Sequence, residues 1–174
     1  VAGGPRRHSS LDPDRKASWN IAPSSGVGMT DRAMLLGTWT ITSWKKEDIA
    51  TGDSVDALGP EPVGYISYGL DNRFFALVVR RDRPKPARLP LTDQDKVDLF
   101  DSMLAYAGSY SLDDEKAVHH VEASWNQIWT GSEQVRFYKL EGDQLEISSP
   151  PAPDPFTGKQ VIHRIKFVRM RTAD

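Results

Sequence analysis

Apolar and polar residues alternate through most of the chain after residue 35, in short runs separated by turn residues. Such alternation, rich in Thr, Trp, Tyr and Val, is typical of half-buried β-strands. The clearest runs are LLGTWTITSWKKED, SYSLDDEKAVHHVEASW, EQVRFYKLEGDQLEISS and QVIHRIKFVRM. About nine short strands with closely spaced turn signals predict an antiparallel barrel or sandwich.

One stretch follows a helical period instead. In LTDQDKVDLFDSMLAYAG, Thr92 is a candidate N-cap and acidic residues fill the first turn. Apolar residues then recur at helical spacing up to Ala107, and Gly108 ends the run. The pattern predicts one amphipathic helix near residues 92–107, capping a barrel end or lying on its wall.

The first 28 residues lack this patterning. They are rich in Gly, Pro, Ser and charge, and we expect them to be a flexible tail or an added extension. Residues 29–174 then form one domain, because a chain of 174 residues and 19.4 kDa suits a single core.

The amino-acid composition excludes several classes of functional site and of binding partner. The chain has no cysteine, which removes disulfides, thiolate nucleophiles and cysteine-based zinc sites. A net charge of −2 gives no basic field for nucleic acid, and no apolar run approaches the ~20 residues that span a bilayer. We expect no nucleic-acid or membrane partner, and the lack of a secretory signal favours a cytoplasmic location.

The residues that indicate a family are Gly37 and Trp39 in LLGTW, which resemble the Gly-x-Trp opening of lipocalins and related calycins. The ordered set LLGTW, LGPEPVGYISY, FDSMLAYAGSY, VHHVEASWNQIWTG, QVRFYKLEGDQLEI and HRIKFVR is similar to the lipocalin-like domain family of small bacterial and fungal barrels. The resemblance implies a calycin-type barrel of about 8–10 strands with an interior cavity for small hydrophobic ligands. It also implies that Arg164 or Arg169 packs over the tryptophan.

Hairpin register predicts which side chains face the interior. The turn at residues 141–144, taken as a two-residue hairpin, places Tyr138 and Arg136 on the same face as Leu145. The turn at residues 113–116 pairs Tyr110 with His119 on the apolar face.

The same register places Ala123 and Trp125 inside, and His120, Glu122 and Ser124 on the solvent face, although a slip of one residue would reverse this assignment. Adjacent histidines on opposite faces cannot share an ion, and no third ligand accompanies the outer pair, so we expect no metal site. His163 is a haem-ligand candidate by analogy with related haem-binding barrels. A structural role is favoured, and we expect no cofactor.

An inward arginine beside tyrosine and histidine suits a ligand with a carbonyl or acid group. The candidate catalytic residues are His119, Arg136 and Tyr110. The candidate ligand-binding residues are Tyr65, Trp125, Trp129, Tyr138, His120 and Glu122.

Three functions stay open at this point. The first is binding of a small, largely hydrophobic, oxygenated ligand inside the barrel. The second is a cofactor-independent isomerase, cyclase or dehydratase that acts on a polyketide-like intermediate with the same residues. The third is a structural protein whose barrel is filled by its own side chains, and a homodimer is compatible with all three. The sequence does not decide whether there is turnover.

Overall fold

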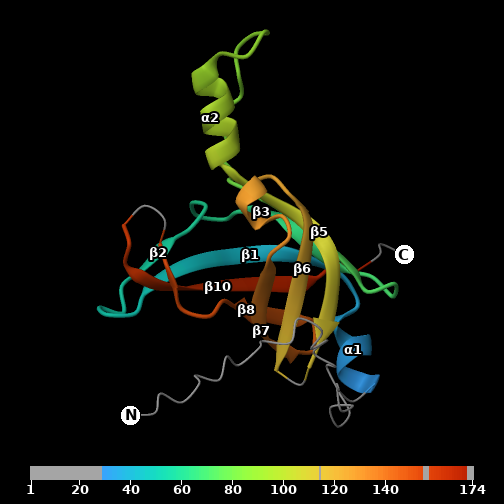
Figure 1. The fold of residues 1–174 in the computed structure, drawn as a ribbon. Coiled ribbons are helices and arrows are strands. Elements are labelled where there is room, and N and C mark those ends of the chain that lie inside the picture. The colour runs from blue at the N-terminus through green and yellow to red at the C-terminus, as the bar shows by residue number, and fades with distance from the viewer. Residues whose placement is uncertain (1–28, 114, 155–156, 172–174) are drawn as a thin grey trace, which may run out of the picture.

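The computed structural model describes residues 29–113, 115–154 and 157–171, which fold into an antiparallel β-barrel (Figure 1). Two α-helices and one 3-10 turn accompany the strands: α1 (Met29–Leu35), α2 (Asp93–Asp101) and η1 (Gln127–Trp129). The strands are β1 (Gly37–Asp48), β2 (Ser54–Asp56), β3 (Val63–Tyr68), β4 (Arg73–Val79), β5 (Met103–Leu112), β6 (Lys116–Ser124), β7 (Glu133–Glu141), β8 (Gln144–Ser148), β9 (Ala152–Pro153) and β10 (Gln160–Arg169).

Eight of these strands close the barrel. The order is β1-β3-β4-β5-β6-β7-β8-β10, and β10 pairs with β1 to complete the circle. The short strands β2 and β9 extend the sheet beside β1 and β10. This closed antiparallel arrangement confirms the predicted all-β barrel.

Inward and outward side chains alternate along the strands, as the sequence pattern predicts. In β5, for example, Leu104, Tyr106, Gly108 and Tyr110 are buried while the residues between them are partly exposed. The buried hydrophobic core is Leu35, Trp39, Ile41, Trp44, Ile66, Tyr68, Phe74, Ala76, Val78, Leu104, Tyr106, Tyr110, Val121, Leu145, Ile147 and Phe167.

The helix begins as predicted and ends early. Thr92 caps α2, and a capping box joins it to Asp95. The helix stops at Asp101, and the residues from Met103 onward form β5, so the prediction that helix continues to Ala107 is wrong. In β5 the two-residue period of the buried side chains prevails over the weaker helical spacing.

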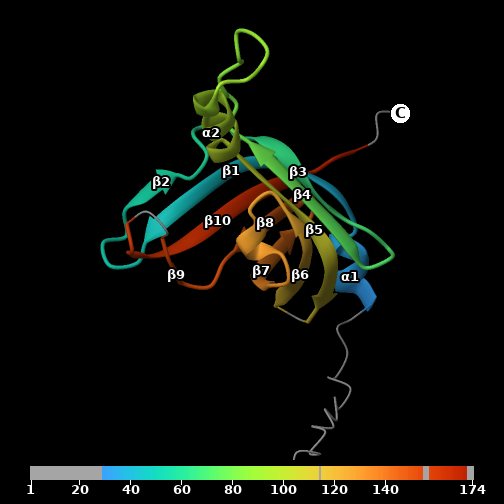
Figure 2. The ribbon, with the colours of Figure 1, turned by 45° about the horizontal axis from the view of Figure 1, so that its top comes forward.

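The position of α2 also differs from the prediction. Instead of capping an end or lying on the wall, it projects from the barrel on the loop between β4 and β5 (Figure 2). No side chain of α2 is buried. The short helix α1, which the sequence pattern did not reveal, lies against the other end of the barrel (Figure 1).

The β5–β6 hairpin follows the predicted register near its turn and departs from it beyond Val121. A bulge makes Glu122 an extra residue, so Ser124 lies opposite Tyr106 and Ala123 faces solvent. The prediction that Ala123 faces inward and Ser124 outward is therefore wrong, because one extra residue reverses the alternation of side chains.

Candidate functional site

One end of the barrel is closed by a tryptophan and an arginine. Trp39 is fully buried, and its indole N–H donates to the Leu35 carbonyl at 2.8 Å. The guanidinium of Arg169 lies 4.0 Å from the indole ring centre, and Nη1 donates to the Leu36 carbonyl at 2.7 Å. The arginine of the predicted cation–π contact is therefore Arg169, whereas Arg164 pairs with Glu47.

His119 lies inside the barrel, enclosed by aromatic side chains. It is 0% exposed, and its Nε2 and Nδ1 atoms lie 2.9 Å and 3.1 Å from the hydroxyls of Tyr68 and Tyr106. The ring stacks on Phe74 with 4.1 Å between centroids. Burial, and then the positive charge of Arg136, hold the pKa of His119 well below its usual 6.5. His119 is therefore a neutral residue whose two nitrogens are already occupied.

Arg136 and His163 belong to one row of residues across three strands. Phe137 of β7 pairs with Ser148 of β8, so the adjacent positions, Arg136 and Ser149, lie beside each other. The Ser149 N–H donates to the His163 carbonyl, and the His163 N–H donates to Ser149 Oγ, each at 3.0 Å. Arg136 and His163 are thus two strand spacings apart, about 10 Å between backbones.

Both side chains of this row face the interior. Arg136 lies two residues from Tyr138, which pairs with Ile147, itself 2% exposed. His163 lies two residues from Val161, which is 4% exposed. Because side chains alternate along a strand, both residues share the inner face with these neighbours. Arg136 and His163 themselves are only half-buried, unlike the inward residues of β4 and β5.

The guanidinium of Arg136 meets no carboxylate in the part of the chain that the structure describes. Its Nη1 donates to the Val135 carbonyl at 2.9 Å, and Nη2 lies 3.4 Å from the side-chain oxygen of Gln134. A guanidinium has five N–H donors, and the two acceptors that it contacts here are neutral. Its remaining donors and its charge are available to bind an anionic group.

Trp44 fixes the orientation and the tautomer of His163. The indole Nε1 donates to His163 Nδ1 at 3.0 Å, and the rings meet edge to face. An indole N–H only donates, so Nδ1 accepts and the neutral ring carries its proton on Nε2. Burial, followed by the charges of Arg136 and Lys46, lowers the pKa of His163 from 6.5 to about 4.

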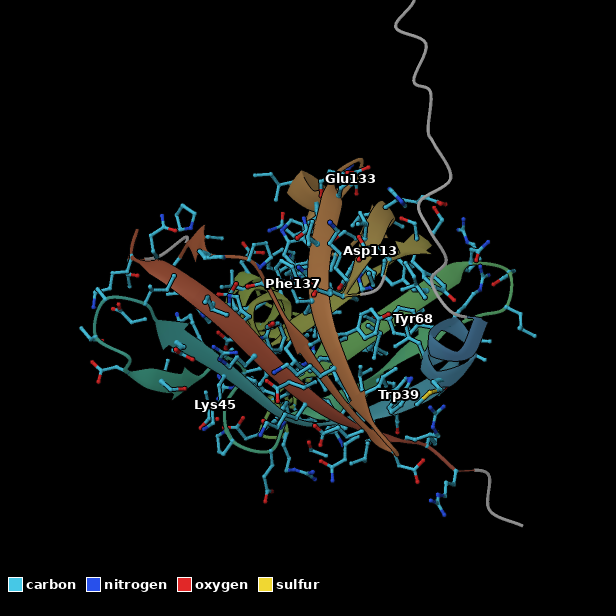
Figure 3. The ribbon with its side chains drawn as sticks, turned by 90° about the horizontal axis from the view of Figure 1, so that it is seen from below. Trp39, Lys45, Tyr68, Asp113, Glu133 and Phe137 are labelled. Carbon is cyan, nitrogen blue, oxygen red and sulfur yellow. The ribbon has the colours of Figure 1, made fainter. Side chains whose placement is uncertain are left out.

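A series of aromatic side chains leads from Tyr106 of β5 to α2. Trp129 meets Tyr106 and Trp125 edge to face, with centroids 5.3 Å and 5.1 Å apart. Trp125 lies 6.1 Å from Phe100 of α2. β7 begins after this loop at Glu133. Figure 3 shows Glu133 at the end of β7 that lies away from Trp39. The barrel half away from Trp39 thus combines aromatic surface with Arg136 and His163.

Two other predicted site residues are inward tyrosines held by backbone carbonyls. The Tyr110 hydroxyl donates to Gly69 at 2.9 Å, and the Tyr138 hydroxyl donates to Asp113 at 3.1 Å. The structure does not bring Tyr110 to Arg136, because Tyr110 packs against Tyr68 instead.

Three predicted ligand-binding residues lie on the outer surface. Tyr65 is 39% exposed, and Glu122 pairs with Arg73 at 2.7 Å. The Nδ1 atom of His120 lies 3.1 Å from a carboxylate oxygen of Glu133. The strand wall therefore separates Tyr65, Glu122 and His120 from the interior residues.

A depression of about 140 Å³ lies over β7, β8 and β10. Charged side chains including Lys139, Glu146 and Lys166 line it, and neither Arg136 nor His163 does.

Within the described residues, no three His, Asp or Glu side chains are grouped so as to hold a metal ion. No helix in the described part of the chain has the length and apolar character needed to cross a membrane.

The closed eight-stranded barrel, with a tryptophan of β1 under an arginine of β10, defines a calycin-type protein. A family model described as a lipocalin-like domain matches residues 36–167, and the chain belongs to this family. It is also similar in part to the crystal structure of an uncharacterized protein from Bacteroides eggerthii, with 11% identity and a TM-score of 0.38 over 78% of this chain and 99% of that one. No curated protein matches the chain.

Proposed function

We propose that the barrel binds a small, largely hydrophobic, oxygenated organic ligand in the half of its interior away from Trp39. The observation that carries this proposal is Arg136, an inward guanidinium that meets no carboxylate among the described residues. Leaving a cation half-buried without a counter-charge costs stability. A ligand with a carbonyl or acid group compensates that cost when it binds.

The burial pattern supports the same half of the barrel. Near Trp39 the interior is filled, and Trp39, Tyr68, Leu35 and His119 have essentially no exposed surface. On β7, by contrast, every inward residue from Gln134 to Leu140 keeps some exposure. A barrel of eight strands is either filled by its own side chains or holds one small ligand, and the incomplete burial on β7 supports the second arrangement.

The experiment is a thermal-shift screen with apolar and aromatic ligands, followed by mass analysis of the bound species. We expect oxygenated apolar compounds to raise the melting temperature and to quench tryptophan fluorescence, because Trp44 and Trp129 lie at the proposed site. If no compound produces either change, the barrel is not a binding module.

The alternative is an isomerase, cyclase or dehydratase that uses the same interior. Such an enzyme needs a group that exchanges a proton with the ligand near neutral pH. The pKa of His163 is about 4, and both nitrogens of His119 are held by tyrosines. This geometry supports binding and polarisation of a carbonyl more than proton transfer. Recovery of an altered ligand in the mass analysis would favour the enzyme.

A further inference from the structure

The second donor of the site is the Nε2 atom of His163. Its Nδ1 accepts from Trp44, so the proton is on Nε2. Among the described residues, Nε2 has no hydrogen-bond partner, and no side-chain nitrogen or oxygen there is both fully buried and unpartnered. Nε2 therefore contacts space that solvent reaches. A neutral imidazole held in one tautomer with its N–H free is an oriented donor.

This donor and the guanidinium of Arg136 lie on the same inner face of the barrel. They come from one row, on either side of Ser149, and both face inward. Their backbones are ~10 Å apart, and the guanidinium hydrogen-bonds to Val135 and Gln134 of its own strand. The positive charge of Arg136 also contributes to the lowered pKa of His163.

We infer that Arg136 and His163 together form a carboxylate-binding subsite, and that the ligand is an apolar carboxylic acid bound in its ionised form. This inference rests on the proposed binding function and specifies its ligand class. Arg136 supplies the charge and His163 supplies a directed neutral donor, so the two oxygens of one carboxylate each accept a hydrogen bond. Trp44 holds the imidazole in place and acts as a positioning residue.

Trp44 also makes the haem alternative unfavourable. A histidine that ligates iron through Nε2 needs the Nε2 lone pair free, and its Nδ1 then donates to a carbonyl or carboxylate. Here the indole donates to Nδ1, so Nε2 carries the proton instead. The same contact that removes a metal-ligating lone pair provides a donor for an oxygen atom.

The test compares an acid with its neutral amide on the full chain. We measure the affinity of 2-naphthoate and of 2-naphthamide by tryptophan fluorescence and calorimetry. Hydrogen bonds to a charged group are worth more than neutral ones, so we expect the acid to bind at least about tenfold tighter than the amide. Equal affinities would overturn the inference and leave the proposed function intact. If no apolar ligand of the wider screen binds either, the proposed function itself fails.

Two variants assign the preference to its residues. Arg136→Met should remove the preference for the acid. Its control is Arg164→Met, which removes a positive charge from the outer face, where Arg164 pairs with Glu47, and should retain the preference. Equal loss in both variants would indicate a general charge effect and would overturn the assignment to Arg136.

His163→Leu removes the second donor, and we expect acid affinity to fall about tenfold while amide affinity changes less. His163→Gln is the conservative variant, because its amide oxygen accepts from Trp44 while its NH₂ group replaces the donor. Circular dichroism and melting curves confirm that each variant folds. If His163→Leu binds the acid like the wild type, or if His163→Gln loses as much affinity as His163→Leu, His163 is not a donor to the ligand.

Discussion

The neutral state of His163 predicts how the stability of the protein depends on pH. Its pKa is about 4 in the folded barrel, against 6.5 for a free histidine, because burial and the Arg136 charge disfavour the protonated ring. Below pH 6.5 the unfolded chain therefore binds a proton that the folded chain excludes. The contribution of neutral His163 to the unfolding free energy is therefore fully present above pH 6.5. It is lost as the pH falls from 6.5 toward 4.

The two pKa values give the magnitude. Between pH 7.5 and pH 5.0, a shift from 6.5 to about 4 removes about 2 kcal/mol of unfolding free energy. His119 adds a loss of the same sign, because its pKa is also lowered. Carboxyl groups such as Asp48, whose pKa a hydrogen bond from Lys159 lowers, titrate below this window.

The assay is urea unfolding, followed by tryptophan fluorescence, at pH 7.5 and 5.0 for the wild type and for His163→Gln. The glutamine still accepts from Trp44 and does not titrate. We expect the pH-dependent loss to be about 2 kcal/mol smaller in the variant than in the wild type. Each protein is compared with itself at the two pH values, so the cost of the substitution that does not depend on pH cancels. Equal losses in the two proteins would refute the assignment of a lowered pKa to His163.

Three further substitutions test the packed half of the barrel, each by urea unfolding at pH 7.5. Arg169→Met removes the cation over Trp39, hydrogen bonds to two backbone carbonyls and an ion pair with Asp143, and should cost about 2 kcal/mol or more, whereas no loss would mean the closure is not stabilising. Tyr106→Phe leaves a nitrogen of buried His119 without its partner and should cost about 1–3 kcal/mol, and a neutral result would argue against that hydrogen bond. In Gly108→Ala the added Cβ would lie 1.9 Å from a backbone oxygen, so we expect a loss of about 3 kcal/mol or more, and a protein of normal stability would contradict the close β5–β6 approach.

The barrel could be predicted because local alternation determines its strands, and the closure by Trp39 was implied by the resemblance of Gly37 and Trp39 to the Gly-x-Trp opening of lipocalins. Strand alternation and the turn at residues 141–144 place Tyr138 opposite Ile147, as the structure confirms. The bulge at Glu122 could not be predicted, since it depends on how β5 and β6 approach each other. The end of α2 was missed because its apolar spacing continues into a strand whose period differs.

The candidate site was only half visible in the sequence for a related reason. Arg136 is assigned to the interior by its own hairpin, which involves neighbouring residues alone. The role of His163 depends on Trp44, a residue 119 positions away, and on the pairing that closes the barrel. No local pattern reports which nitrogen of a histidine is occupied. His119 has the more suggestive sequence context, beside a second histidine, yet it is the enclosed residue.

The two interior histidines therefore differ by what satisfies their nitrogens. His119 has two tyrosine hydroxyls, so its hydrogen-bonding capacity is used in joining β3, β5 and β6 around the filled half of the barrel. His163 has one indole, so its Nε2 donor has no partner among the described residues. Because solvent reaches Nε2, this donor can exchange a water molecule for a ligand oxygen. An apolar carboxylate would supply that oxygen and complete the donors in the other half of the barrel.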